Sequence, residues 1–170
     1  MILIQAIGKI ENLKTLQESI ISILNTKCLI SSQFLDVPEH TYNPLRNQYN
    51  STKMLLFLKS TIKEDSAHVL GITDVDLYAP GLNFVFGEAE SPGKFAIVSL
   101  YRLKHPDKKI FRERMVKEAI HELGHTFGLA HCNNPSCVMY FSNSIIDTDK
   151  KSYMFCDTCL KKLKLTGNLN

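Results

Sequence analysis

The sequence predicts an α/β fold, and two observations lead to that class. Apolar runs with strand character alternate with segments whose apolar residues recur at helical spacing. A strand at 2–8, a helix at 11–25 and a strand at 28–36 open the chain, an order that suggests a parallel strand pair joined by a crossover helix. At 170 residues the chain is one domain, long enough to bury a proper core.

The alternation continues along the rest of the chain. We expect a helix at 52–63, strands at 68–75, 83–88 and 95–101, and a second long helix at 110–127. Residues 37–51 are polar and are expected to be the longest irregular stretch. Within that stretch Arg46, Gln48 and Tyr49 would either contact a substrate or belong to a plain surface connection.

Composition is that of an ordinary soluble globular chain, with 44% apolar and 22% charged residues. The net charge of +3 is too small to argue for nucleic acid or an anionic membrane as partner. No run approaches the roughly 18 apolar residues of a membrane span. The first residues lack a basic leader, and Gln5 interrupts their apolar run, so they predict a strand rather than an export signal. We therefore expect a cytoplasmic protein, in which cysteines serve as metal ligands rather than in disulfides.

Three histidines stand at metal-ligand spacing in the run HELGHTFGLAHC, which begins at His121. His121 and His125 are four residues apart, so on a helix they share one face and both reach one zinc ion at about 2.0–2.1 Å. Gly128 adopts a left-handed conformation at little cost, so it can end the helix and return His131 to the metal. The alternative is that the histidines cap and line a buried helix, but the glycine and the third histidine in register argue against a chance match.

Glu122 follows the first of these histidines, about 100° further round the helix, so it borders the metal without binding it. Three neutral histidines leave a fourth position for water, whose pKa bound zinc lowers to about 7. Glu122 would take the proton of that water and later deliver it to the leaving amine. The pattern predicts a zinc-dependent peptidase. The alternative is a non-catalytic zinc protein that binds peptide or nucleic acid, which would have no use for an acid beside an open zinc site.

Four cysteines follow the histidines and predict a second metal site. Cys132 and Cys137 enclose four residues, and Cys156 and Cys159 enclose two. Together they complete a closed four-cysteine zinc site, whose role is structural, with Zn–S distances near 2.3 Å. The alternative is a redox pair in the C-x-x-C spacing of the last two. The remaining Cys28 opens a predicted strand and is expected to be a small buried hydrophobe.

With these motifs the chain resembles the archaemetzincins, a family of small metzincin-type zinc peptidases. The resemblance rests on H-E-x-x-H-x-x-G-x-x-H, joined to C-x4-C-x-M and then C-x-x-C, and it continues more weakly upstream in RNQYNS, VLGITDVDLY and FVFGEA. It implies that the three histidines bind the catalytic zinc, that Glu122 is the general base, and that the four cysteines bind a second zinc. It also implies that Met139 is the methionine turn beneath the zinc ligands, although a lone methionine is usually just core. Phe141 stands where some other metzincins carry a tyrosine near the metal.

The same resemblance implies a zincin fold, with a mixed, mostly parallel five-stranded sheet whose antiparallel edge strand, 83–88, holds peptide substrates. We expect a single metzincin-like peptidase domain over 1–170, divided into an N-terminal subdomain, 1–131, with the zinc helix and a zinc-bound C-terminal subdomain, 132–170. The substrates would be short peptides, cleaved by an aminopeptidase or an endopeptidase. We expect neither nucleic acid nor a membrane as partner, and a monomer. Residues 140–155 have no readable pattern and are expected to shape the substrate pocket.

Overall fold

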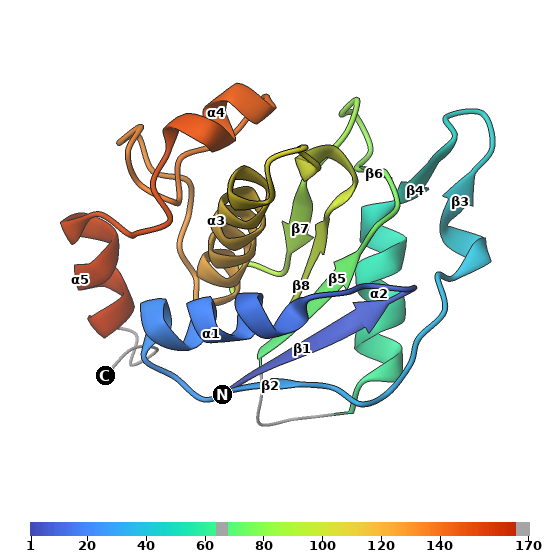
Figure 1. Cartoon of the computed structure of the whole chain (residues 1–170), viewed down its shortest axis with the longest axis horizontal. Helices are drawn as coiled ribbons and strands as arrows, with labels where there is room; N and C mark the ends of the chain where they lie inside the picture. Colours follow the sequence, from blue (N-terminus) through green and yellow to red (C-terminus); the bar gives the residue numbers. More distant parts are fainter. Residues whose placement is uncertain (64–67, 166–170) are drawn as a thin grey trace.

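The computed structural model describes residues 1–63 and 68–165, so the end of the expected domain, 166–170, lies outside the described residues. Five strands form the main sheet in the order β2-β1-β5-β8-β7, and β7 alone among these strands runs antiparallel to its neighbour (Figure 1). Their bounds are β1 Ile2–Ile7, β2 Cys28–Ile30, β5 His68–Thr73, β7 Gly87–Ala89 and β8 Phe95–Ser99. The expected mixed, mostly parallel five-stranded sheet is confirmed.

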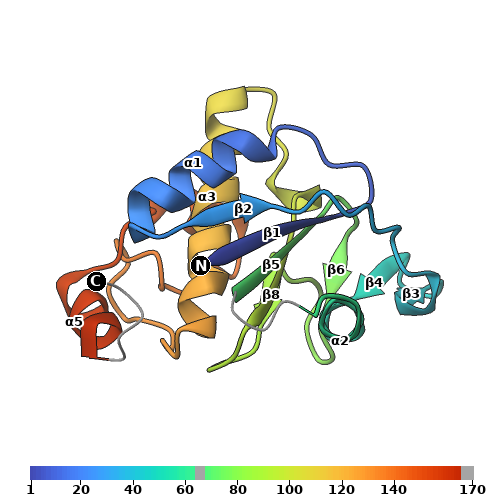
Figure 2. The same ribbon diagram turned by 90° about the horizontal axis from the view of Figure 1, so that it is seen from below.

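Helices cover both faces of this sheet. The five α-helices are α1 Leu13–Leu24, α2 Ser51–Thr61, α3 Lys108–Thr126, α4 Ile145–Lys150 and α5 Asp157–Leu165, and two 3-10 helices span Glu39–Thr41 and Tyr101–Leu103. Figures 1 and 2 show α1 and α3 on one side of the sheet and α2 on the other. The three helices predicted at 11–25, 52–63 and 110–127 are confirmed to within two residues at each end.

Side-chain alternation along the strands explains the two layers. In β8, Ala96 and Val98 pack with the α1–α3 side, while Phe95 and Ile97 pack with α2. Successive side chains of a strand point to opposite faces, so one strand supplies both cores. A sheet covered on both faces is the usual arrangement for parallel strands.

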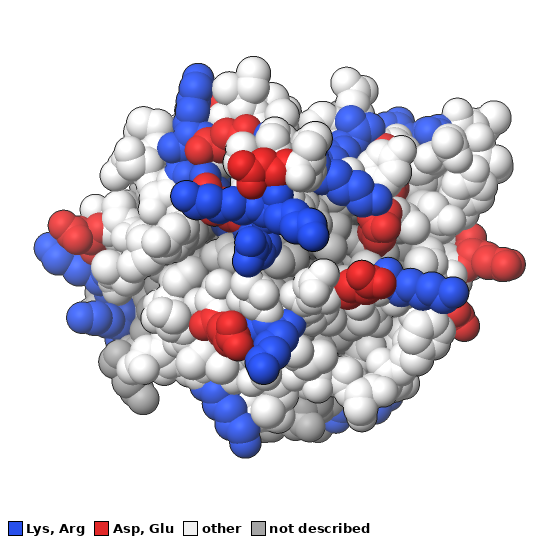
Figure 3. Space-filling view, viewed as in Figure 1, with Lys and Arg blue, Asp and Glu red and all other residues white. Residues whose placement is uncertain are grey.

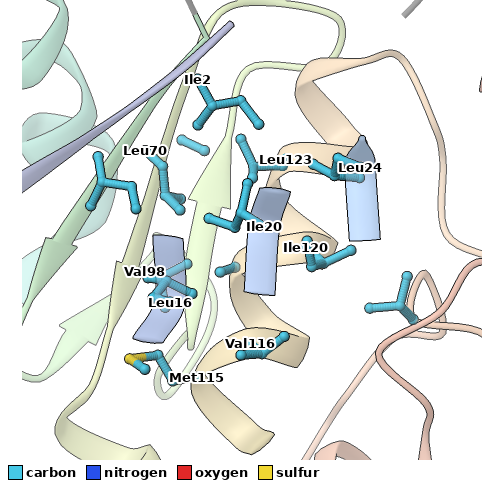
Figure 4. Packing of buried hydrophobic residues seen from close by; sticks show 14 of the residues in the cluster. Ile2, Leu16, Ile20, Leu24, Leu70, Val98, Met115, Val116, Ile120 and Leu123 are labelled. Carbon is cyan, nitrogen blue, oxygen red and sulfur yellow. The ribbon is translucent and has the colours of Figure 1, made fainter. Parts of the chain in front are cut away.

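The helix α3 lies at the centre of the larger core, between the sheet and α1. Figure 4 shows Ile20 of α1 and Ile120 and Leu123 of α3 packed together with Leu70 and Val98 of the sheet. All five side chains are fully buried, and each such burial contributes about 1.5–3 kcal/mol. The C-terminal end of α3, which carries His121 and the residues after it, is therefore held by a rigid core.

Strand β2 is shorter than the strand predicted at 28–36. It pairs with β1 only as far as Ile30. Just beyond, the side-chain amide of Gln5 donates to the carbonyl of Gln33 at 2.8 Å, and so occupies an acceptor that a regular ladder would offer to main-chain N–H groups. The prediction is wrong over 31–36, apart from a single bridge at Leu35.

The antiparallel edge strand is confirmed as a feature, but it lies later than the predicted 83–88. The strand β7 is Gly87–Ala89. Before it, the N–H of Val85 donates to the carbonyl of Leu77 at 2.9 Å, so this part of the chain lies against a smaller sheet instead. The N–H of Val85 and the carbonyl of Asn83 therefore have partners that the local sequence does not reveal.

That smaller sheet occupies the stretch expected to be irregular. Within 37–51, β3 is Tyr42–Asn43 and β4 is Gln48–Asn50, and with β6, Leu77–Tyr78, they form a sheet in the order β3-β4-β6. The prediction of a long irregular stretch is wrong, because β4 finds its parallel partner far along the chain, at Tyr49↔Leu77. A polar segment gives no local signal of such a partner.

Charged side chains of both signs are interspersed on the face shown in Figure 3. Two of the ion pairs join Arg102 to Asp76 and Lys104 to Asp74, each at 2.7 Å. Among the described helices, none combines the length and the apolar character that crossing a bilayer requires.

Candidate metal centres and active site

A glycine-dependent turn ends α3 and starts the return of the chain toward the histidines. Gly128 has φ +89°, the left-handed conformation expected for it. Its N–H donates to the carbonyl of His125 at 2.8 Å, and the N–H of Leu129 donates to the carbonyl of Gly124 at 3.0 Å. These two bonds are a Schellman motif, which satisfies the last helical carbonyls and reverses the chain direction. His131 follows three residues after the reversal.

The turn brings the three predicted histidines together. His121, His125 and His131 each offer a ring nitrogen, and these nitrogens lie within 4.8 Å of one another. The Nε2 atoms of His121 and His125 are 3.2 Å apart. Two nitrogens bound tetrahedrally to one zinc at about 2.0–2.1 Å would be about 3.4 Å apart. The donor set and its spacing therefore fit a zinc ion.

Main-chain carbonyls orient two of the imidazoles. Nδ1 of His121 donates to the carbonyl of Val138, and Nδ1 of His125 donates to the carbonyl of Leu129, both at 2.7 Å. A hydrogen bond from Nδ1 leaves Nε2 unprotonated and available to a metal. Burial lowers the pKa of both rings and of His131. All three are thereby kept neutral, which is the form that binds metal ions.

Glu122 lies beside these histidines in a buried position. Its side chain is 6% exposed. Burial raises the pKa of Glu122 well above its usual range, and the nearby Glu118 carboxylate raises it further. The edge strand passes so close that a β-carbon on Gly87 would lie 2.7 Å from Cγ of Glu122. Glu122 is thus a carboxyl group with raised proton affinity, held against the edge of the sheet.

A cavity of about 560 Å³ opens over these side chains, and we call it the active-site cavity. One wall is the segment 82–89, which includes β7, and residues 141–143 also line the cavity. Glu118, the three histidines and Glu122 complete this part of the lining. Of the stretch 140–155, expected to shape the pocket, only 141–143 reach the cavity. The Phe141 ring lies beside the His131 ring at an interplanar angle of 54°, with centroids 4.8 Å apart.

The four predicted cysteines also come together. The Sγ atoms of Cys132 and Cys156 are 3.8 Å apart, as are those of Cys137 and Cys159, and all four lie within 4.8 Å of one another. Four sulfurs around a tetrahedral zinc at about 2.3 Å would be about 3.8 Å apart. A hydrogen bond from the N–H of Cys159 lowers the pKa of the Cys156 thiol to about 7. Cys28 lies outside this group, where burial raises its pKa to about 11.

The histidine group and the cysteine group adjoin in the main chain. His131 and Cys132 are neighbours in sequence, and the N–H of Cys132 donates to the carbonyl of Met139 at 2.9 Å. Met139 is fully buried and lies directly against α3, since a β-carbon on Gly124 would be 2.4 Å from its Sδ. The position is the one that the resemblance implies for a methionine turn, beneath the histidines.

Arg46 supports the cavity wall from outside instead of lining it. Its guanidinium donates to the carbonyls of Leu82 and Asn83 at 2.9 and 3.0 Å and lies over the Tyr78 ring at 4.3 Å. Gln48 donates to the same Asn83 carbonyl at 3.0 Å. Of the two roles left open by the sequence, the structure favours a structural one for both residues.

Two buried residues near the histidines were missed from the sequence. Lys151 has no exposed side-chain surface, and its Nζ lies 3.0 Å from Oε1 of Glu118. The helix α4, which precedes Lys151, carried a local signal, because Ser144 and Asp147 form a capping box. No local sequence pattern predicts the ion pair between Lys151 and Glu118.

The fold and the site together are those of a zinc metalloprotease. The chain belongs to the archaemetzincins: it matches Peptidase family M54 over residues 2–165. An archaemetzincin of Methanocaldococcus jannaschii is 52% identical over 139 residues, which are 78% of this chain and 75% of that protein. An archaemetzincin of Saccharolobus solfataricus is 40% identical over 161 residues, which are 89% of this chain and 87% of that protein.

Solved structures agree with this assignment. The crystal structure of the Methanopyrus kandleri archaemetzincin has a TM-score of 0.89 and 42% identity, and the match covers 98% of this chain and 94% of that one. A zinc-dependent peptidase from Methanocorpusculum labreanum has a TM-score of 0.84 and 30% identity, and the match covers 96% and 100% of the two chains. The expected family, the zincin-type fold and the class of enzyme are confirmed.

Proposed function

We propose that this zinc-dependent peptidase hydrolyses short peptides, with His121, His125 and His131 holding the catalytic zinc and Glu122 acting as general base. The observation that carries the proposal is the buried carboxyl group of Glu122, which lines the same cavity as the three imidazoles. A protein that only bound zinc or peptide would gain nothing from a proton acceptor at that position.

Each side chain has a chemical part in this proposal. Zinc, when bound, supplies a Lewis acid that polarises a carbonyl and makes water acidic. The three histidines hold it from the helix and the turn, and leave one side open toward the cavity. Glu122 accepts the proton of the attacking water and passes it to the leaving amine.

The edge strand supplies a place for the substrate. β7 is the outermost strand of the sheet order, so one row of its main-chain groups is free to pair with an extended peptide. The active-site cavity of about 560 Å³ is the size of a small-ligand site, which supports short peptides. Removal of a terminal residue and cleavage within the peptide are both compatible with this arrangement.

We also propose a second, structural zinc on Cys132, Cys137, Cys156 and Cys159, giving two ions per chain. The matched sulfur spacings support it. Since the two sites adjoin at one peptide bond, the subdomains 1–131 and 132–170 would act as one peptidase domain. Thiolate ligands persist where thiols stay reduced, which supports a cytoplasmic location.

The test is cleavage of a mixed peptide library by the zinc-loaded protein and by its Glu122→Ala variant, with products identified by mass spectrometry. We expect cleavage by the wild type and a loss of about 10²–10⁴ in kcat/KM for the variant, the usual contribution of a general base. The matched control is Glu113→Ala, which removes an exposed glutamate from the same helix. No cleavage by the wild type would refute the peptidase proposal. Equal cleavage by the wild type and by Glu122→Ala would show that Glu122 is not the general base.

A further inference from the structure

A buried polar seam joins α3 to the segment that follows the methionine turn. Arg114, Lys117 and Glu118 face α4 and are only 7%, 6% and 2% exposed. Arg114 forms a two-bond fork with Asp149 at 2.7 Å, and Lys117 Nζ donates to the carbonyls of Thr148 and Asp149 at 3.1 and 2.9 Å. Charged groups are rarely buried without a specific partner, so this seam specifies how α4 docks.

Lys151 lies at the end of the seam nearest the histidines. Its Nζ is 3.0 Å from Oε1 of Glu118, 3.4 Å from the carbonyl of Tyr140 and 3.5 Å from Nδ1 of His121. Glu118 in turn accepts a hydrogen bond from Oγ1 of Thr148 at 2.9 Å. The proposed mechanism uses neither the lysine nor the carboxylate of Glu118.

These contacts form a closed series that begins at Glu118 and ends at His121, both on α3. Glu118 holds Lys151, and Lys151 reaches the carbonyl of Tyr140. Two residues before Tyr140, the carbonyl of Val138 accepts the Nδ1 hydrogen bond of His121. Glu118 and His121 lie one helical turn apart. The series of contacts therefore fixes the position of residues 138–140 relative to the imidazole of His121, which the Val138 carbonyl orients.

We propose that Glu118 and Lys151 are positioning residues of the three-histidine site: the pair clamps residues 138–140 onto α3, and so keeps the His121 ring aimed at the zinc position. The inference rests on the proposed function for the identity of the metal site. Hydrogen-bond partners of metal-binding histidines restrict the ring's orientation, and their loss typically costs 10–100-fold in metal affinity or activity. The pair acts through Tyr140 and Val138, and Lys151 Nζ also lies 3.5 Å from Nδ1 of the ring itself.

The test compares Lys151→Met with Lys117→Met, a matched control in which the neighbouring buried lysine of the same seam is removed. Lys117 donates to carbonyls of α4, and among the described residues its ammonium forms no hydrogen bond or ion pair with Glu118 or His121. Zinc affinity of the three-histidine site is measured by competition with a chelator. The Nδ1–H signal of His121 in zinc-loaded protein is followed by ¹⁵N-resolved NMR. We expect Lys151→Met to weaken zinc binding by about 10-fold or more and to shift or broaden that signal.

The control should change zinc affinity by no more than about twofold, the usual size of an indirect effect. Because Lys151→Met leaves the Glu118 charge buried without its cation, that variant can lose stability. The double variant Glu118→Gln/Lys151→Met removes both charges, which protects folding. It should keep the defect in zinc affinity and in the His121 signal. Wild-type values in the double variant, or equal defects in Lys117→Met, would overturn the proposal.

The readouts also separate this inference from the peptidase proposal. Zinc affinity and the His121 signal are measured without any substrate, so a protein that cleaves nothing still gives an answer. With a cleaved peptide, a positioning role predicts that kcat falls more than KM rises, because the pair orients a metal ligand and not the peptide. A change confined to KM would contradict the assignment.

Discussion

Gly124 and Met139 pack so closely that no β-carbon fits between them: at Gly124 it would lie 2.4 Å from Sδ and 3.1 Å from Cε of Met139. The glycine stands in the last turn of α3, where it costs up to about 1 kcal/mol of helix stability relative to alanine. The close contact with Met139 explains why glycine occupies position 124. The methionine lies directly beneath the helix turn that presents His121 and His125.

Gly124→Ala should therefore destabilise the protein although alanine is the better helix former. Met139 is fully buried and has little freedom to move aside, so overpacking of about 1–3 kcal/mol outweighs the gain in propensity. The measurement is the free energy of unfolding in urea. In a Met139→Ala background the closest clash is removed and Cε1 of Phe155 remains 3.2 Å from the added β-carbon, so the same substitution should cost less stability than in the wild type. An equal loss in both backgrounds would contradict the packing explanation.

Gly87→Ala should impair catalysis by displacing Glu122. The added β-carbon would lie 2.7 Å from Cγ of Glu122 and 2.5 Å from the carbonyl oxygen of Ile97. A displacement near 1 Å at the reacting centre can cost about 100-fold in rate. We expect kcat to fall by about that factor while bound zinc is retained.

The matched control for Gly87 is Gly71→Ala, another glycine of the sheet, whose β-carbon would meet Cδ2 of Leu58 at 3.0 Å. It should cost stability without a comparable loss of kcat in the protein that remains folded. Both variants are compared by urea unfolding and by steady-state kinetics. If their losses of activity follow only their losses of stability, Glu122 is not displaced.

Arg46→Lys should loosen the outer wall of the active-site cavity. A lysine cannot donate to the carbonyls of Leu82 and Asn83 together while stacking on Tyr78, as the planar guanidinium does. The loss of about 1 kcal/mol in wall stability corresponds to a rise of about fivefold in KM. Kinetics on a cleaved peptide test this, with Arg112→Lys as control because, in the part of the chain that the structure describes, Arg112 donates to the carbonyl of Lys108 of its own helix and not to the cavity wall. Equal KM values for wild type and Arg46→Lys would show that this wall does not contact substrate.

Cys156→Ser should remove one of the two proposed zinc ions and spare the other. Metal analysis after dialysis is expected to fall from about two zinc ions per chain to about one, because a closed site rarely survives the loss of a thiolate. Cys28→Ser is the matched control, since that buried cysteine lies outside the cluster. Retention of both ions in Cys156→Ser would refute the four-cysteine site.

Predictions from the sequence succeeded where the determining contacts are local. The helices α1, α2 and α3 follow from apolar spacing over a few turns, and each lies within two residues of its predicted bounds. The left-handed turn at Gly128 is local in the same sense. The strands 28–36 and 83–88 failed because a strand is limited by where its partner's hydrogen-bonding groups lie. The side chain of Gln5 lies 28 positions from its partner Gln33, and Leu77, the partner of Val85, belongs to a separate strand of the smaller sheet.

The sequence by itself determined the chemistry of the site. Spacings of a few residues are enough to place two imidazoles on one helix face and two sulfurs on one loop, because helix and turn geometry is nearly invariant. Only the tertiary structure decided what surrounds that chemistry. The ion pair of Glu118 with Lys151 spans 33 positions of the chain, and the hydrogen bond of Arg46 to Leu82 spans 36. Such contacts depend on how elements distant in sequence pack together. The local sequence around each residue therefore does not predict its partner.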